Sequence, residues 1–170
     1  MTILIINGAN NTSSRINGVA QYIKQTAQNV EEIIVHQLPA EALITADYTS
    51  EIIQQANEQV AKADTVIVLT PVYKAAYSGI LKTYLDLIPQ KGLVGKTILP
   101  IAVGGSYHHL LAIDYALKPV LSAIGATNVL QGVYIVDQQI ERTETGFTID
   151  AQIEARLDEQ LAQIEVLQTV

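Results

Sequence analysis

The sequence contains no cysteine among its 170 residues. This absence excludes disulfide bonds, thiolate nucleophiles, thiol-ligated zinc and iron–sulfur clusters together. Charged residues are also scarce, at 16% of the chain, whereas roughly 25% is usual for a soluble domain. Because few charges are available to cover the outer surface, we expect another subunit to cover part of it.

Basic residues are outnumbered: 10 Lys and Arg stand against 17 Asp and Glu, for a formal net charge of −7 and a pI near 4.8. This balance argues against a nucleic-acid partner, and no polybasic cluster is present to hold an anionic membrane. No apolar run approaches the roughly 20 residues of a membrane span. The first residues, MTILIINGANN, lack the features of a signal peptide, so we expect a cytoplasmic protein.

Strand-like and helix-like segments alternate along the whole chain. The strand-like runs are rich in Ile, Val and Leu, as expected of strands buried on both faces, and cover 2–7, 31–38, 64–70, 97–103 and 128–136. Apolar residues at helical spacing lie between or after them: Ile16, Val19, Ala20 and Ile23; Ile52, Ile53, Ala56 and Val60; Ile153, Leu157, Leu161 and Ile164. We predict a single domain over residues 1–170, a three-layer α/β sandwich with five strands.

Ligands of such sheets bind beyond the carboxyl ends of the strands, which singles out the loops after the first, third and fourth strands. The first loop, NGANNTSSRING at 7–18, leads into a helix whose N-terminal N–H groups suit an anion. Arg15 could add positive charge. The polar side chains of the loop could add hydrogen-bond donors: Asn11, Thr12, Ser13 and Ser14. The alternative is that Ser13 or Ser14 only caps the helix. Neither G-x-G-x-x-G nor G-x-x-x-x-G-K-[ST] is present, so no Rossmann or P-loop site is supported.

The loop after the third strand, LTPVYKAAYSG at 69–79, carries aromatic rings but no acid, cysteine or histidine. Pro71 fixes its own φ and stiffens the chain, so backbone N–H groups stand in a short rigid segment at Val72, Tyr73 and Lys74. Ser78 begins the next helix. A flat heteroaromatic ring with acceptors along one edge would fit this segment. The alternative is that Tyr73 and Tyr77 are ordinary half-buried aromatics at a helix start.

The loop after the fourth strand, VGGSYHHLL at 103–111, contains Gly104 and Gly105, which let backbone approach a ligand or adopt positive φ. His108 and His109 are adjacent, which is poor spacing for chelating one ion, and we expect no metal site. Further along, the stretch 140–150 is expected to form a small hairpin turning at Gly146, to which no chemistry is assigned.

The helical segment HHLLAIDYALKPVLSAIGA contains Pro119, which cannot donate a hydrogen bond to the carbonyl of Tyr115. We predict a kink or π-bulge between these two residues. The alternative is that Pro119 opens a new helix. The segment is apolar nearly all round, which favours burial in a symmetric subunit interface.

Three blocks of the sequence, TPVYKAAYSGILKTYLDLIP, LVGKTILPIAVGG and HLLAIDYALKPVLSAIGA, resemble the NADPH-dependent FMN reductase family. They are similar in particular to the reductase component of two-component alkanesulfonate monooxygenases. The resemblance implies a flavodoxin-like fold with a five-stranded parallel sheet of order 2-1-3-4-5, helices on both faces, and assembly as a homodimer or homotetramer. It also implies hydride transfer from NADPH or NADH to FMN, with reduced flavin passed to a partner monooxygenase in sulfonate metabolism.

The resemblance also implies which residues bind the cofactor. The phosphate would lie at the loop from Asn11 to Ile16, and the isoalloxazine ring along the segment from Pro71 to Tyr73. The remaining cofactor-binding positions would be Lys74, Ser78, Gly104, Gly105, Ser106 and Tyr115, the last matching a tyrosine inserted in the interface helix of sulfonate-linked members. No catalytic side chain is expected, because the cofactors supply the hydride chemistry.

One departure from the family concerns the first loop, which usually opens Gly-Ser-x-Arg and here reads Gly8-Ala9-Asn10-Asn11. A hydroxyl and a guanidinium are missing, and charge-assisted contacts of this kind are strong. We therefore expect FMN to behave as an exchanging substrate. Two other functions stay open: an FMN-bound quinone, azo or chromate reductase, and a flavodoxin-type electron carrier, although the T/S-x-T-G-x-T loop of flavodoxins is absent.

Overall fold

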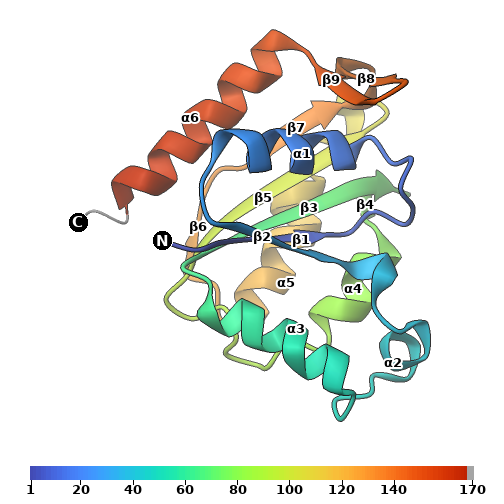
Figure 1. The fold of residues 1–170 in the computed structure, drawn as a ribbon, viewed down its shortest axis with the longest axis vertical. Coiled ribbons are helices and arrows are strands. Elements are labelled where there is room, and N and C mark those ends of the chain that lie inside the picture. Colours follow the sequence, from blue (N-terminus) through green and yellow to red (C-terminus); the bar gives the residue numbers. More distant parts are fainter. Residues whose placement is uncertain (168–170) are drawn as a thin grey trace.

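The centre of the fold is a sheet whose strands run in the order β2-β1-β3-β5-β6, with β7 also paired to β5 (Figure 1). The computed structural model of the chain describes residues 1–167. The strands of this sheet are β1 (Ile3–Asn7), β2 (Val30–Ile34), β3 (Thr65–Tyr73), β4 (Ala76–Tyr77), β5 (Thr97–Gly104), β6 (Asn128–Val129) and β7 (Val133–Val136). Counted as the five predicted strands, the order is 2-1-3-4-5, so the flavodoxin-like sheet is confirmed. All pairs are parallel except β3 with the short β4.

Helices cover both faces of this sheet (Figure 1). Their bounds are α1 (Ile16–Thr26), α2 (Ala40–Thr45), α3 (Glu51–Lys62), α4 (Gly79–Leu85), α5 (Lys118–Ala123) and α6 (Ala151–Leu167). Strand β1 shows why two layers form, because successive side chains of a strand point to opposite faces. Ile3 and Ile5 pack in one core cluster with residues of α1 and α6, whereas Leu4 and Ile6 pack in the other with residues of α3 and α4.

The apolar helix faces follow the predicted spacing with one exception. The four residues predicted for the first helix and the four predicted for the last helix are all buried. In α3, Ile53, Ala56 and Val60 are buried, but Ile52 is 49% exposed, so its assignment to the buried face was wrong. Among residues 1–167, no helix is both long enough and apolar enough to cross a bilayer.

The predicted fifth strand, 128–136, is broken into β6 and β7, and Pro100 of the neighbouring β5 accounts for the break. Val129 pairs with Ile98 and Val133 pairs with Ile101. Between these pairs, three residues of the outer strand stand opposite two of β5. Pro100 has no N–H to offer to a neighbour at this point. Gly132, at φ +88° and packed on the backbone of Pro100, carries the chain round the bulge.

The predicted second strand, 31–38, was too long. Strand β2 ends at Ile34, and a 3₁₀ helix occupies Val35–Gln37. Its His36 ring nitrogen Nδ1 lies 2.9 Å from the carbonyl oxygen of Ala9. This turn of helix therefore ties the end of β2 to the loop after β1.

The helix irregularity predicted around Pro119 is confirmed. Residues Ile113–Leu117 form a π-helix, and α5 begins directly after it, at Lys118, with Pro119 in its first turn. The predicted irregularity and the alternative of a new helix opened by proline thus describe one arrangement. Tyr115, in the middle of the π-helix, is 79% exposed.

The hairpin predicted for 140–150 is also confirmed, although its turn lies at Glu144 and Thr145, one residue before the predicted Gly146. Strands β8 (Ile140–Thr143) and β9 (Gly146–Ile149) pair antiparallel. The hairpin follows β7 through a 3₁₀ turn, Asp137–Gln139, and lies beside the start of α1 (Figure 1). A segment late in the sequence is therefore placed next to the first loop.

Candidate functional site

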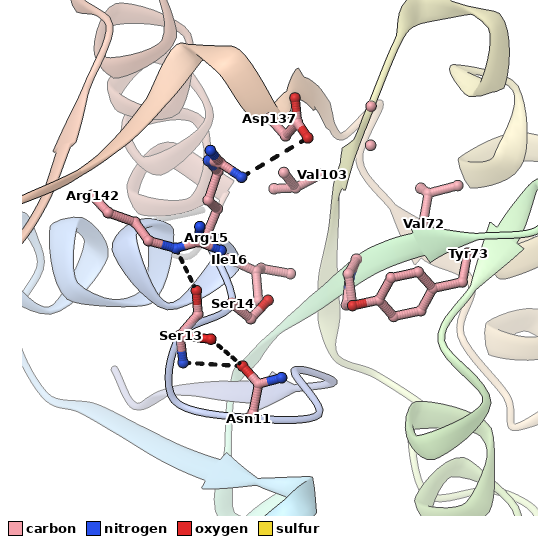
Figure 2. A pocket seen from close by; sticks show the side chains of 13 residues that line it. Asn11, Ser13, Ser14, Arg15, Ile16, Val72, Tyr73, Val103, Asp137 and Arg142 are labelled. Carbon is pink, nitrogen blue, oxygen red and sulfur yellow. Dashed lines mark hydrogen bonds and ion pairs between the residues drawn. The ribbon is translucent and has the colours of Figure 1, made fainter.

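A cavity of about 260 Å³ opens at the edge of the sheet where β1, β3 and β5 end (Figure 2). Its walls come from the first loop, the end of β3, the end of β5 and the segment after β7. The lining residues are Asn11, Ser13, Ser14, Arg15, Ile16, Pro71, Val72, Tyr73, Val103, Gly104, Gly105, Asp137 and Arg142. The structure therefore brings together the three loops that the sequence singled out.

The first loop takes its shape from two buried or half-buried asparagines beneath it. Asn7, fully buried at the end of β1, accepts a hydrogen bond from the backbone N–H of Ala9 (2.9 Å) and donates one to Oδ1 of Asn17 (2.9 Å). The amide nitrogen of Asn17 in turn donates to the carbonyl oxygens of Asn11 and Thr12, at 3.1 Å each. Side-chain amides thus hold a backbone segment that has no regular hydrogen-bond ladder of its own.

No side chain caps α1, so the capping alternative for Ser13 and Ser14 is not what the structure shows. Oδ1 of Asn11 instead accepts hydrogen bonds from the backbone N–H (3.0 Å) and the hydroxyl (2.8 Å) of Ser13. The helix starts at Ile16, with Ser14 and Arg15 half-buried just before it. The positive end of the helix dipole therefore faces the cavity without a side-chain acceptor of its own.

Two guanidinium groups stand at this end of the cavity (Figure 2). Nε of Arg15 donates to the carbonyl oxygen of Ile140 (2.9 Å), and its Nη1 lies 4.0 Å from Oδ2 of Asp137. Nε of Arg142 donates to the carbonyl oxygen of Ser13 (2.7 Å). Two positive charges and one negative charge line this end, so the first loop faces a net positive surface in a chain of net charge −7.

The opposite wall is built from backbone and apolar side chains (Figure 2). Val72 and Tyr73 close β3, and their pairing with β4 turns the chain back through Lys74 and Ala75, at φ +50° and +66°. The hydroxyl of Tyr73 donates to Oδ1 of Asn10 (3.2 Å) and joins this wall to the first loop. The only titratable group on this wall is the Tyr73 phenol, so the wall supplies shape and N–H groups.

Gly104, the last residue of β5, and Gly105, which follows it, have different reasons to be glycine, and neither has positive φ. A Cβ on Gly104 would collide with the hydroxyl of Tyr134, which donates to the carbonyl oxygen of Ser106 at 2.7 Å. Burial and the nearby charge of Asp137 raise the pKa of this tyrosine above its ordinary value. A Cβ on Gly105 would meet nothing within 4 Å. Gly104 is therefore fixed by packing, whereas Gly105 leaves backbone open beside the cavity.

Five of the predicted cofactor-binding residues do not line the cavity: Thr12, Lys74, Ser78, Ser106 and Tyr115. Ser78 is buried, and its hydroxyl donates to the carbonyl oxygen of Gly8 (2.7 Å) and accepts the N–H of Leu81 (3.2 Å) as the cap of α4. Tyr115 projects into solvent from the π-helix. Both side chains therefore lie outside the space that a ligand of this one subunit would fill.

Three lining residues were missed by sequence reasoning: Val103, Asp137 and Arg142. Asp137 directly follows the end of β7, so the rule that parallel strands share a carboxyl edge would have found it. Arg142 comes from the hairpin, to which no chemistry was assigned. Within residues 1–167 no group of three or more His, Cys, Asp or Glu side chains could hold a metal ion.

The donor set fits a ligand with an anionic tail and a flat ring. Helix N–H groups, Ser14 and two arginines stand at one end, where phosphate oxygens would find charge-assisted hydrogen bonds. Val72, Tyr73 and the open backbone at Gly105 stand at the other, where a planar ring would lie against peptide groups. FMN has this combination of parts.

Comparison with known proteins agrees with this geometry. The sequence profile of the NADPH-dependent FMN reductase family matches residues 1–141. An FMN reductase (NADPH) of Pseudomonas putida is 44% identical over 166 residues, which are 95% of this chain and 83% of the relative. An FMN reductase (NADPH) of Escherichia coli K12 is 42% identical over 144 residues, 82% of this chain and 75% of the relative. The apo form of an NADH:FMN oxidoreductase, EMOB, has a TM-score of 0.80 at 31% identity, covering 97% of this chain and 88% of that one.

The profile reaches from β1 into the first residues of β8, and so contains all of the lining residues except Arg142. The match in sequence and the match in fold both extend over the loops that build the cavity. The chain therefore belongs to the NADPH-dependent FMN reductase family and is an NAD(P)H:FMN oxidoreductase.

Proposed function

We propose that the chain binds FMN in this cavity, reduces it with NADPH or NADH, and releases the reduced flavin to a partner monooxygenase, in keeping with its resemblance to sulfonate-linked reductases. The observation that supports the proposal most is the union, in one cavity, of an anion-binding helix start and a wall of open backbone. The flavin supplies the chemistry when bound, because it accepts hydride directly from the nicotinamide.

The protein's own part is to position the ring and keep it in place. The segment from Pro71 is rigid because the buried hydroxyl of Thr70 donates to the carbonyl oxygen of Pro71 (2.8 Å) and accepts the N–H of Ser78 (2.9 Å). Backbone N–H groups on such a segment can meet the acceptor edge of the ring without reorganising. Gly105 lets the neighbouring loop approach the ring closely.

We further propose that FMN is an exchanging substrate. By the resemblance, the serine and arginine that the family carries near the start of the first loop are replaced here by Ala9 and Asn11. The positive charge of Arg15 is partly balanced by Asp137, whose Oδ2 lies 4.0 Å from Nη1 of Arg15. Extensive dialysis of the purified protein should therefore remove the yellow colour. A protein that stays bright yellow after dialysis would contradict this part of the proposal.

A subunit interface over the π-helix is proposed as well. Three large apolar side chains within six residues of sequence are exposed: Leu110 (46%), Leu111 (53%) and Tyr115 (79%). Their segment follows the cavity loop at the end of β5. Exposed apolar clusters of this kind mark interaction sites. Tyr115→Ala should lower the oligomer mass measured by light scattering or weaken flavin retention, and unchanged behaviour in both assays would refute the role.

An anaerobic mixing experiment tests the activity. Protein, FMN and either NADPH or NADH are combined, and bleaching of the flavin absorbance band is followed. Rapid bleaching with free FMN in excess is expected. If a quinone is instead reduced while FMN stays bound, the chain acts as a quinone reductase of the same fold and the flavin-supply proposal is wrong.

A further inference from the structure

We propose that Arg142 binds the phosphate of the flavin, and that the chain thereby selects FMN over riboflavin. The inference rests on the proposed function, because it concerns the same cavity. Arg142 lies outside the part of the chain matched by the family profile, which ends at residue 141.

The contacts of Arg142 leave most of its hydrogen-bonding capacity free. Within residues 1–167 its one hydrogen bond runs from Nε to the carbonyl oxygen of Ser13, and it makes no ion pair. A guanidinium group carries five N–H donors in a rigid fork. The N–H groups on both Nη atoms are thus available at the cavity, and a fork of this geometry suits phosphate oxygens.

The charges around Arg142 also call for an anion. Arg15 lines the same end of the cavity, and the one acid there, Asp137, lies 4.0 Å from Arg15. Like charges brought together on a surface are unfavourable unless an anion joins them. The chain has three arginines and is strongly acidic, yet two of the three stand together here. A ligand phosphate would balance the second guanidinium.

The hairpin holds Arg142 in a defined place. Ile140, at the start of β8, is 1% exposed and belongs to the core cluster beneath α1. On the helix side, a Cβ on Gly18 would come within 2.7 Å of the Cβ of Phe147, the residue paired with Arg142 in the hairpin. The hairpin therefore packs directly on α1, and the arginine that it carries is fixed relative to the helix start.

The arrangement also adds to what the first loop supplies. Arg15 is the one guanidinium that the loop itself carries, and Arg142 brings a second from a segment 129 positions beyond Ser13. Its Nε bond to the Ser13 carbonyl sets the group beside the serines of the loop (Figure 2). The phosphate end of the site is thus completed by the C-terminal hairpin.

Binding of FMN and of riboflavin, which lacks the phosphate, tests the inference. Each flavin is titrated into the wild type, Arg142→Gln and Arg142→Lys, and quenching of flavin fluorescence is measured. Arg142→Gln should raise the Kd of FMN about tenfold, the effect of one partly exposed charge-assisted contact, and leave riboflavin binding unchanged. Arg142→Lys keeps the positive charge but loses the forked guanidinium, so its Kd for FMN should lie between that of the wild type and that of Arg142→Gln.

Arg156→Gln is the matched control. Arg156 also donates to a main-chain carbonyl, that of Tyr134 (3.2 Å), but does not line the cavity. It should leave the affinity for both flavins unchanged. The inference fails if Arg142→Gln leaves FMN affinity unchanged, or if it weakens FMN and riboflavin equally, which would show a role in loop structure only. A wild type that binds neither flavin would instead refute the proposed function itself.

Discussion

Substitution of the two adjacent glycines at the end of β5, Gly104 and Gly105, should affect different properties: the first the stability of the fold, the second the affinity for FMN. Gly104→Ala places a Cβ inside van der Waals contact with the hydroxyl of Tyr134, 3.0 Å from its Cζ and 3.3 Å from Cβ of Val72. Tyr134 is 6% exposed, so its ring has little room to move away. Any shift of the ring also breaks the hydrogen bond from its hydroxyl to the carbonyl oxygen of Ser106.

The size of the effect follows from these contacts. Overpacking in a filled core costs about 1–3 kcal/mol, and the lost hydrogen bond about 1 kcal/mol. We expect Gly104→Ala to lower the free energy of unfolding by about 2–4 kcal/mol, less than the total stability of a typical domain. In a thermal melt the same loss lowers Tm by about 5–15 °C for a chain of this length. Urea denaturation followed by circular dichroism gives the free energy directly.

A double-mutant cycle identifies the atom responsible. Tyr134→Phe removes the hydroxyl that a Cβ at position 104 would hit, leaving Cζ at 3.0 Å as the nearest atom of the ring. Gly104→Ala should therefore cost about 1–2 kcal/mol less in the Tyr134→Phe background than in the wild type. An equal cost in both backgrounds, or a cost below about 0.5 kcal/mol in the wild type, would refute the reasoning.

Gly105→Ala is the control for backbone effects. Nothing lies within 4 Å of its Cβ, and the residue does not have positive φ. Stability should change by no more than about 0.5 kcal/mol. The added methyl group nevertheless enters space beside the cavity, so FMN affinity should fall. Loss of stability without loss of flavin binding would contradict the description of this loop.

Three further predictions concern other parts of the chain. Lys74→Asn combined with Ala75→Gly should raise the free energy of unfolding by about 1–2 kcal/mol in urea denaturation, because both positions have positive φ in a two-residue hairpin turn. Asp137→Asn should tighten FMN binding about fivefold in fluorescence titration, because it frees Arg15 and removes a charge that opposes phosphate; weaker binding would contradict this. Lys96 has a pKa lowered by burial, so the unfolded chain binds more protons between that pKa and 10.5, and the stability of the wild type relative to Lys96→Met should rise with pH across this interval.

The parts of the fold that depend on local pattern were predicted from the sequence, and the parts that depend on a neighbour were not. Continuous apolar runs and helical spacing gave the layers and the strand positions, because burial on both faces leaves a direct trace in the residues. The bulge at Gly132 has its cause in Pro100, on a different strand. By its position Ser78 is a polar residue in a predicted ligand loop, but its hydroxyl is used within the core. Only the packing of Gly8 against α4 reveals this.

The two ends of the site differ in the same way. The wall formed by Val72, Tyr73 and Gly105 is main chain at the tips of two neighbouring strands, so topology fixes it. The rule that ligands bind at the carboxyl edge of the sheet was enough to predict that Pro71 to Tyr73 would lie at a cavity there. The opposite end of the cavity, where we propose that the phosphate binds, is lined by long side chains, so its composition depends on which side chains can reach it. Arg142 reaches it only because the hairpin packs on α1 at Gly18. A short motif near the first loop therefore undercounts the positive charge at this end of the cavity, to which Arg15 and Arg142 both contribute.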